Sequence, residues 1–125
     1  MWDIPGGGLP VEPIYRAMEF LNMSRLYPPG SEASRLESMR AVWEKTGLQS
    51  IETRVIRIRV SYSNFNDFWD SNSAPTAPVG QAISKLSPEA RDQLKTQLRK
   101  QLPQGADGSI YYEAFANAVK GRVPA

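Results

Sequence analysis

The chain has 125 residues, of which 41% are apolar and 22% are charged, and this composition is typical of one globular domain. It contains no cysteine and no histidine, which excludes disulfides, thiolate catalysis, Ser-His-Asp catalysis and metal sites built on those residues. The net charge of +2 does not indicate binding to nucleic acid. No apolar run approaches the ~18 residues of a membrane helix, and the first residues lack the pattern of a signal peptide. We therefore expect a cytoplasmic protein that binds neither nucleic acid nor a membrane.

The first 47 residues predict a strand end, a loop and two helices. Trp2-Asp3 is expected to end a strand, and Gly6-Gly7-Gly8 to form a flexible loop. Pro13 suits the first turn of a helix. Ser34, with Glu37 three residues later, has the form of a capping box that begins the second helix. The first helix has an apolar face at helical spacing, made of Ile14, Ala17, Met18 and Leu21.

Two long strands are predicted in the remainder, at residues 51–62 and 109–119. In the first, apolar residues such as Ile56 and Ile58 alternate with polar ones such as Arg57, so one face is expected to be buried and the arginines to line the other. A two-stranded ribbon alone is marginally stable in water. The sequence therefore predicts that both strands belong to a larger sheet, and that residues 1–125 form a single domain or part of one.

Two helices and a flexible stretch are predicted between those strands. A short capped helix from Asn64 carries three aromatic residues, and residues 71–80 hold two prolines and are expected to be flexible. Ser87 and Pro88 then begin a long helix with leucines at every fourth position.

The order of these motifs resembles the C-terminal part of class I S-adenosylmethionine-dependent methyltransferases of the bacterial type. The resemblance spans nearly the whole chain. It rests on an ordered set of motifs, none of them diagnostic alone: Trp2-Asp3 with Gly6-Gly7-Gly8, Gly47-Leu48, the strand from Ile51 to Val60, Phe65-Asn66-Asp67-Phe68-Trp69, Leu86-Ser87-Pro88-Glu89-Ala90-Arg91 and Asp107-Gly108-Ser109-Ile110.

The resemblance implies an α/β fold, a partial Rossmann-like methyltransferase sheet that consists mainly of an antiparallel C-terminal strand pair with three or four helices. Residues 51–62 and 109–119 would be the sixth and seventh strands of that family, and Trp2-Asp3 would end the fifth. The seventh strand of the family normally pairs with the fifth.

The cofactor, S-adenosylmethionine, is bound in that family by a glycine-rich turn and an acidic residue on earlier strands, and neither feature occurs here. Gly6-Gly7-Gly8 does not fit the G-x-G-x-x-G pattern. The resemblance therefore predicts the substrate-side segment of a methyltransferase, truncated relative to the family, with no cofactor-binding residues and no metal site, and inactive alone.

Asp3 is the candidate for chemistry, because a carboxylate at this place in the family could orient a methyl acceptor or take its proton. A loop aspartate without a catalytic role is the favoured alternative. The resemblance also places Trp2, Tyr62, Phe65 and Trp69 on the substrate side, although aromatic packing onto the sheet would explain the last three equally. The arginines and lysines within 54–59 and 91–100 are expected to be exposed to solvent.

Three functions stay open at this point. The first is a methyltransferase segment that works with a separate cofactor-binding half. The second is a non-catalytic module that forms a homodimer through an exposed sheet edge. The third is a small-ligand-binding α+β fold in which further strands within these residues complete the sheet.

Overall fold

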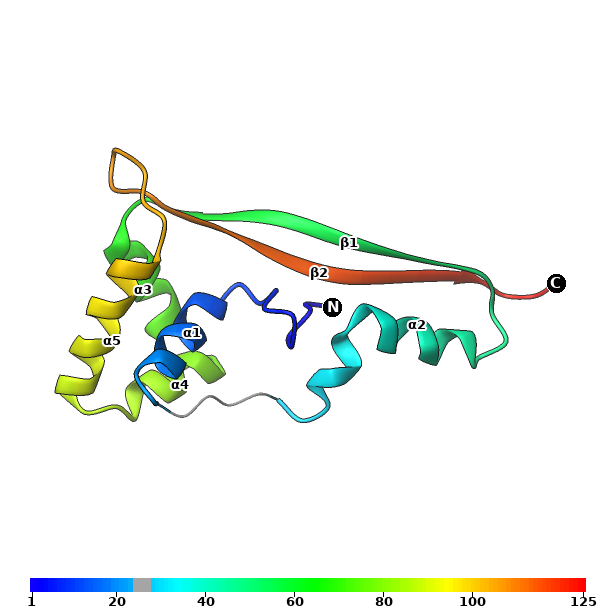
Figure 1. The fold of residues 1–125 in the computed structure, drawn as a ribbon, viewed down its shortest axis with the longest axis horizontal. Helices are drawn as coiled ribbons and strands as arrows, with labels where there is room; N and C mark the ends of the chain where they lie inside the picture. Colours follow the sequence, from blue (N-terminus) through cyan, green and yellow to red (C-terminus); the bar gives the residue numbers. More distant parts are fainter. Residues whose placement is uncertain (24–27) are drawn as a thin grey trace. The chain divides into compact units, whose positions relative to one another are not determined.

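The computed structural model describes residues 1–23 and 28–125, and in them it has five α-helices, one 3-10 helix and a two-stranded antiparallel sheet (Figure 1). This agrees with the predicted α/β class in its coarse form. The elements in chain order are α1 (Glu12–Phe20), η1 (Ser31–Ser34), α2 (Leu36–Glu44), β1 (Gln49–Tyr62), α3 (Phe65–Ser73), α4 (Pro78–Ser84), α5 (Pro88–Gln101) and β2 (Ile110–Arg122).

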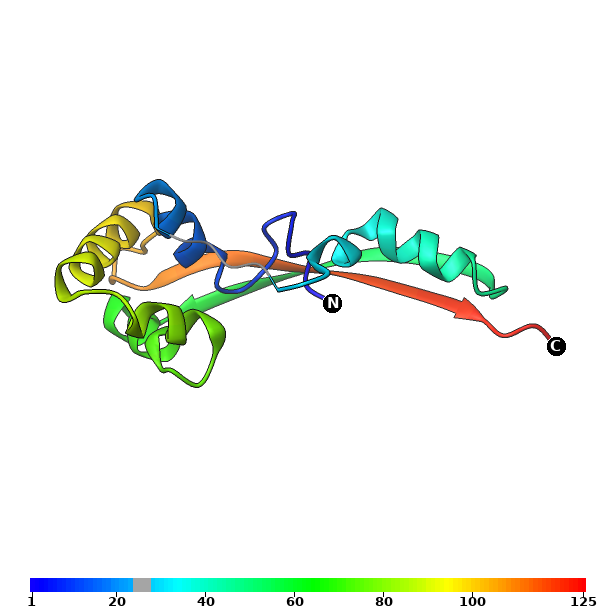
Figure 2. The same ribbon diagram turned by 90° about the horizontal axis from the view of Figure 1, so that it is seen from below.

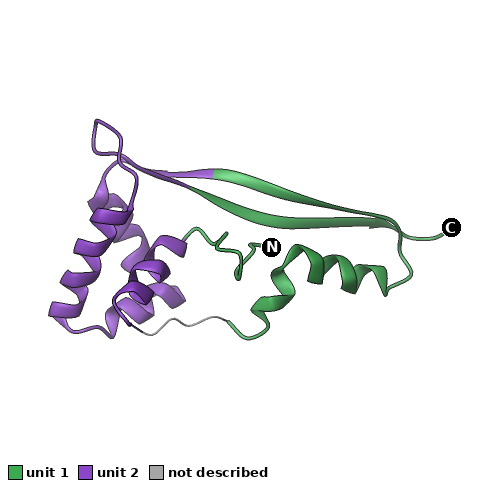
Figure 3. Ribbon diagram, in the orientation of Figure 1, with its two compact units in different colours: residues 1–10, 26–58, 113–125 green, residues 11–25, 59–112 purple. Residues whose placement is uncertain are grey.

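The two predicted strands are present and are slightly longer than expected. β1 and β2 lie side by side along their length in both views of the ribbon (Figure 2). Two compact units share this ribbon (Figure 3). The first unit contains residues 1–10, 26–58 and 113–125, and the second contains residues 11–25 and 59–112.

The second unit holds nearly all of the apolar core. In it α1 packs against α5, and α3 packs against α4. The apolar face predicted for α1 is confirmed in Ile14, Ala17 and Met18, and the leucine stripe of α5 is buried at Leu94 and Leu98. The remaining core residues of this unit are Tyr15, Phe65, Phe68, Trp69, Val79, Ile83, Leu102 and Ile110.

The first unit has a different interior. Its buried residues are small or polar, namely Gly8, Ser34, Ala114 and Asn117. Helix α2 has no buried residue. On β1, Val55, Ile56 and Ile58 keep 37%, 45% and 44% of their surface exposed. Each exposed aliphatic side chain forgoes part of the roughly 1.5–3 kcal/mol that full burial contributes, so this unit is held more by hydrogen bonds than by an apolar core.

Two sequence predictions about helices are wrong. Residues 71–80, predicted as flexible, contain the end of α3 and the start of α4, where Pro78 occupies the first turn. Pro78 therefore begins a helix, for which its fixed φ is suited, whereas Pro75 lies in the turn between α3 and α4. The five α-helices within residues 1–23 and 28–125 exceed the three or four expected.

The capping box at Ser34 and Glu37 is also absent. Ser34 ends η1, and α2 begins only at Leu36 without a side-chain cap. The Ser34 hydroxyl donates to the Ser31 carbonyl at 2.6 Å and accepts from the Ile4 amide at 3.1 Å. Ser34 therefore joins η1 to the N-terminal segment through Ile4, and the spacing of residues in the sequence does not reveal such a distant contact.

Candidate functional site

Trp2 lies beside β2 as the strand-like residue that the sequence predicted. It forms an antiparallel bridge with Ala116. The flanking backbone pairs as well, because the Asn117 amide donates to the Met1 carbonyl at 2.8 Å and the Asp3 amide donates to Phe115 at 3.3 Å. Residues 1–3 therefore pair with β2 like a short third strand. They lie along the edge of β2 opposite to the edge that pairs with β1.

The glycine loop that follows is pinned, contrary to the predicted flexibility. The Gly8 amide donates to the Asp3 carbonyl at 2.8 Å, and the Phe115 amide donates to the Gly8 carbonyl at 3.0 Å. A Cβ added at Gly8 would lie 2.2 Å from the Phe115 carbonyl oxygen. Glycine is required here because the loop backbone approaches the β2 backbone directly.

Asp3, the candidate for chemistry, uses its carboxylate inside the first unit. Oδ1 accepts from the Gly6 amide at 2.9 Å, and Oδ2 accepts from the Asn117 side chain at 2.9 Å. Asn117 is 1% exposed and also donates to the Ser34 carbonyl at 2.8 Å. Because both oxygens of Asp3 already accept hydrogen bonds, the geometry favours a structural role for this carboxylate.

Asn117 is the residue of this network that sequence reasoning did not single out. It holds Asp3 and Ser34, which are 114 and 83 residues away along the chain. The available signal was a polar side chain in a strand whose neighbours are Ala116, Ala118 and Val119. A buried amide must find partners, so its position predicts a network without identifying the members.

The aromatic residues predicted for the substrate side lie together in the second unit. Phe65 stacks on Trp69 with ring centroids 6.5 Å apart, and Phe68 meets both Tyr62 and Tyr112 edge to face at 5.4 and 6.2 Å. Phe65, Phe68 and Trp69 are buried. Their geometry is that of a packed aromatic core, and only Tyr62 is half-exposed among the predicted substrate residues of this unit.

Tyr62 and Tyr112 add a polar group to this cluster. The Tyr62 hydroxyl accepts from the Asn72 side chain at 3.3 Å. Burial, and then the neighbouring Tyr62 hydroxyl, raise the pKa of Tyr112 above its ordinary value. Tyr112 therefore stays protonated under conditions in which an exposed phenol ionises.

The basic residues of α5, expected to be solvated, partly cover the aromatic core. Lys95 Nζ lies 4.9 Å from the centroid of the Trp69 ring, and Arg99 Cζ lies 4.0 Å from that of Phe65. Such contacts stabilise by about 0.5–2 kcal/mol each, depending on solvation. Lys95 and Arg99 of α5, each one position after a buried leucine, therefore cover the aromatic core.

The arginines of β1 make similar contacts across the ribbon. In the first unit, Arg57 Cζ lies 5.3 Å from the Phe115 ring and its guanidinium is 3.9 Å from Glu113. In the second unit, Arg59 Cζ lies 4.5 Å from the Tyr111 ring. These side chains stay largely exposed, so they cover strand β2 without forming a closed site.

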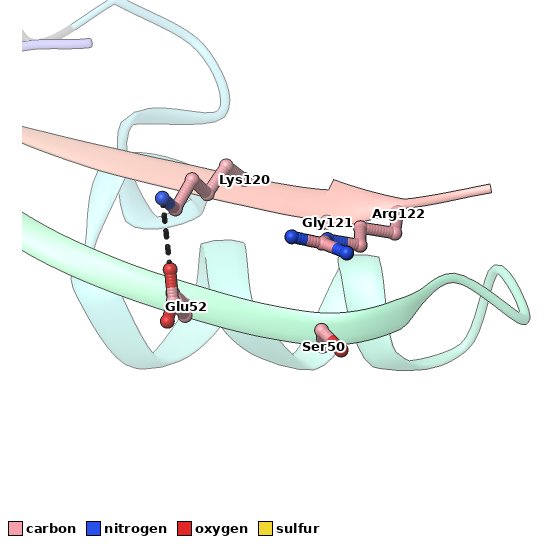
Figure 4. Close-up of a pocket in the computed structure, with 5 residues that line it drawn as sticks. All are labelled: Ser50, Glu52, Lys120, Gly121 and Arg122. Atoms are coloured by element: carbon pink, nitrogen blue, oxygen red, sulfur yellow. Dashed lines mark ion pairs between the residues drawn. The ribbon is translucent and has the colours of Figure 1, made fainter.

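Shallow hollows lie near the end of the ribbon in the first unit. One of about 440 Å³ is lined by Ser50, Glu52, Lys120, Gly121 and Arg122. Figure 4 shows the ion pair between Lys120 and Glu52 in it, with a nitrogen-to-oxygen distance of 3.0 Å. Ser50 is the one hydroxyl of its lining, and Glu52 and Lys120 are paired with each other and form no side-chain hydrogen bond with Ser50, so the lining shows no hydrogen-bonded nucleophile and base.

The five predicted site residues are divided between the units. Trp2 and Asp3 belong to the first unit, while Tyr62, Phe65 and Trp69 belong to the second. Trp2 and Asp3 belong to a hydrogen-bonded strand edge. Tyr62, Phe65 and Trp69 belong to an aromatic cluster.

Two further features bear on function. Among the described residues, no group of His, Cys, Asp or Glu could hold a metal ion. No helix within residues 1–23 and 28–125 is long and apolar enough to cross a membrane. Comparison of the chain with protein-family models, with curated proteins and with solved structures found no match.

Proposed function

We propose that this chain is the C-terminal, substrate-side segment of an S-adenosylmethionine-dependent methyltransferase, and that it acts with a separate cofactor-binding half. The observation that carries the proposal is the order of the strand positions. Trp2 pairs with one edge of β2, and β1 pairs with the other. The methyltransferase resemblance implies this order, in which the seventh strand pairs with both the fifth and the sixth.

The distribution of the core supports the same proposal. The second unit buries its apolar residues, whereas the first has an exposed ribbon and a helix without a buried residue. A ribbon of two strands needs more strands or a covering layer for independent stability. A cofactor-binding half that continues the sheet beyond Trp2 would supply both.

The methyl acceptor would then meet the half-exposed Tyr62 in the second unit, where Phe65 and Trp69 are the buried aromatic residues of the same cluster. Trp2, in the first unit, would belong to the strand edge that the cofactor-binding half continues. Asp3 would position the strand edge and would not act as a base, because its oxygens are engaged by Gly6 and Asn117. S-adenosylmethionine would supply the methyl group from a site on the other half.

A fusion protein tests this proposal. The cofactor-binding half of a class I methyltransferase, ended before its own equivalent of Trp2-Asp3, is joined to residue 1 of this chain. We expect the fusion to unfold in one transition whose midpoint rises with S-adenosylmethionine, since a ligand that binds the native state stabilises it. The cofactor-binding half alone is the control. Independent unfolding of the two parts, with no effect of this chain on cofactor binding, would reject the proposal.

A second candidate function is a non-catalytic module that associates through its sheet edge. The observation that favours it is the exposure of Val55, Ile56 and Ile58 on β1, the outer strand of the ribbon. The mass of the chain in solution tests this candidate, because a monomer at all concentrations contradicts self-association. The third candidate, a self-contained sheet, has less support because the described residues add only the short pairing of residues 1–3 to the two-stranded sheet.

A further inference from the structure

We draw no further inference here: the strongest candidate, the basic surface patch on the C-terminal half of α5, in which Lys95 and Arg99 lie over rings of the aromatic core already described and Arg99 and Lys100 complement the dipole of their own helix, carries nothing further because nothing in the structure shows what would bind there.

Discussion

Replacing Asn117 by alanine should weaken the first unit by a predictable amount. The side chain is 1% exposed and donates to the Asp3 carboxylate at 2.9 Å and to the Ser34 carbonyl at 2.8 Å. A hydrogen bond to a charged group contributes about 1.5–3 kcal/mol, and a neutral one about 0.5–1.5 kcal/mol. Asn117→Ala should therefore destabilise this unit by roughly 2–4 kcal/mol.

Native-state hydrogen exchange measures this loss where it occurs. The amides of Phe115 and Asn117 donate to Gly8 and Met1, so their opening reports on the attachment of the N-terminal segment to β2. We expect faster exchange at both amides in Asn117→Ala, in proportion to the lost free energy. The exposed Asn66 on α3 provides the control, since Asn66→Ala should leave both amides unchanged.

A second variant at the same position adds a pH signature. Asn117→Asp would place a buried carboxylate against that of Asp3, which raises the folded-state pKa of the new group above its unfolded value. The folded state then takes up the proton first as the pH falls, so the destabilisation should be largest at neutral pH and should shrink in acid. A loss in Asn117→Ala below about 0.5 kcal/mol, within the range of ordinary surface substitutions, would refute the reasoning for the whole network.

Three further outcomes are expected in the second unit. The pKa of Tyr112 is raised above its ordinary 10.0, so the unfolded state ionises first above that pH. Stability should therefore fall as the pH rises above 10.0, and Tyr112→Phe should remove this contribution, as followed by phenolate absorbance and urea unfolding. Gly80→Ala should destabilise α4 strongly, because its Cβ would lie 1.7 Å from the Ala74 carbonyl oxygen; an unchanged melting temperature would show that this close approach is absent. Ser87→Ala should lower the free energy of unfolding in urea by about 1 kcal/mol, because it removes the N-cap hydrogen bond of α5. Ser87→Thr keeps a hydroxyl at the cap and should retain most of that free energy.

Local features of the fold could be predicted because they depend on near neighbours. The strands β1 and β2 and the cap at Ser87 follow from side chains a few residues apart, and the structure has these elements. The buried face predicted for β1 is wrong, because Ile56 and Ile58 remain 45% and 44% exposed. The cap of α3 is also confirmed, since Asn64 accepts from the Asp67 amide at 2.8 Å. Periodicity and capping chemistry therefore sufficed for these elements.

Features that depend on distant contacts could not be predicted in the same way. Helix α4 forms where Pro78 suggested a loop, and Gly80 permits its close approach to Ala74. Ser34 serves Ile4, not the helix that follows it. The role of Asp3 depends on Asn117 at the other end of the chain, and no spacing rule connects residues that far apart.

Titration calorimetry of the chain with S-adenosylmethionine, with its mass in solution measured alongside, tests the central proposal most directly. A substrate-side segment without a cofactor site should release no binding heat at micromolar concentrations, whereas the fusion to a cofactor-binding half should bind. Micromolar binding by the chain alone would contradict the account, because it would require a cofactor site within these 125 residues.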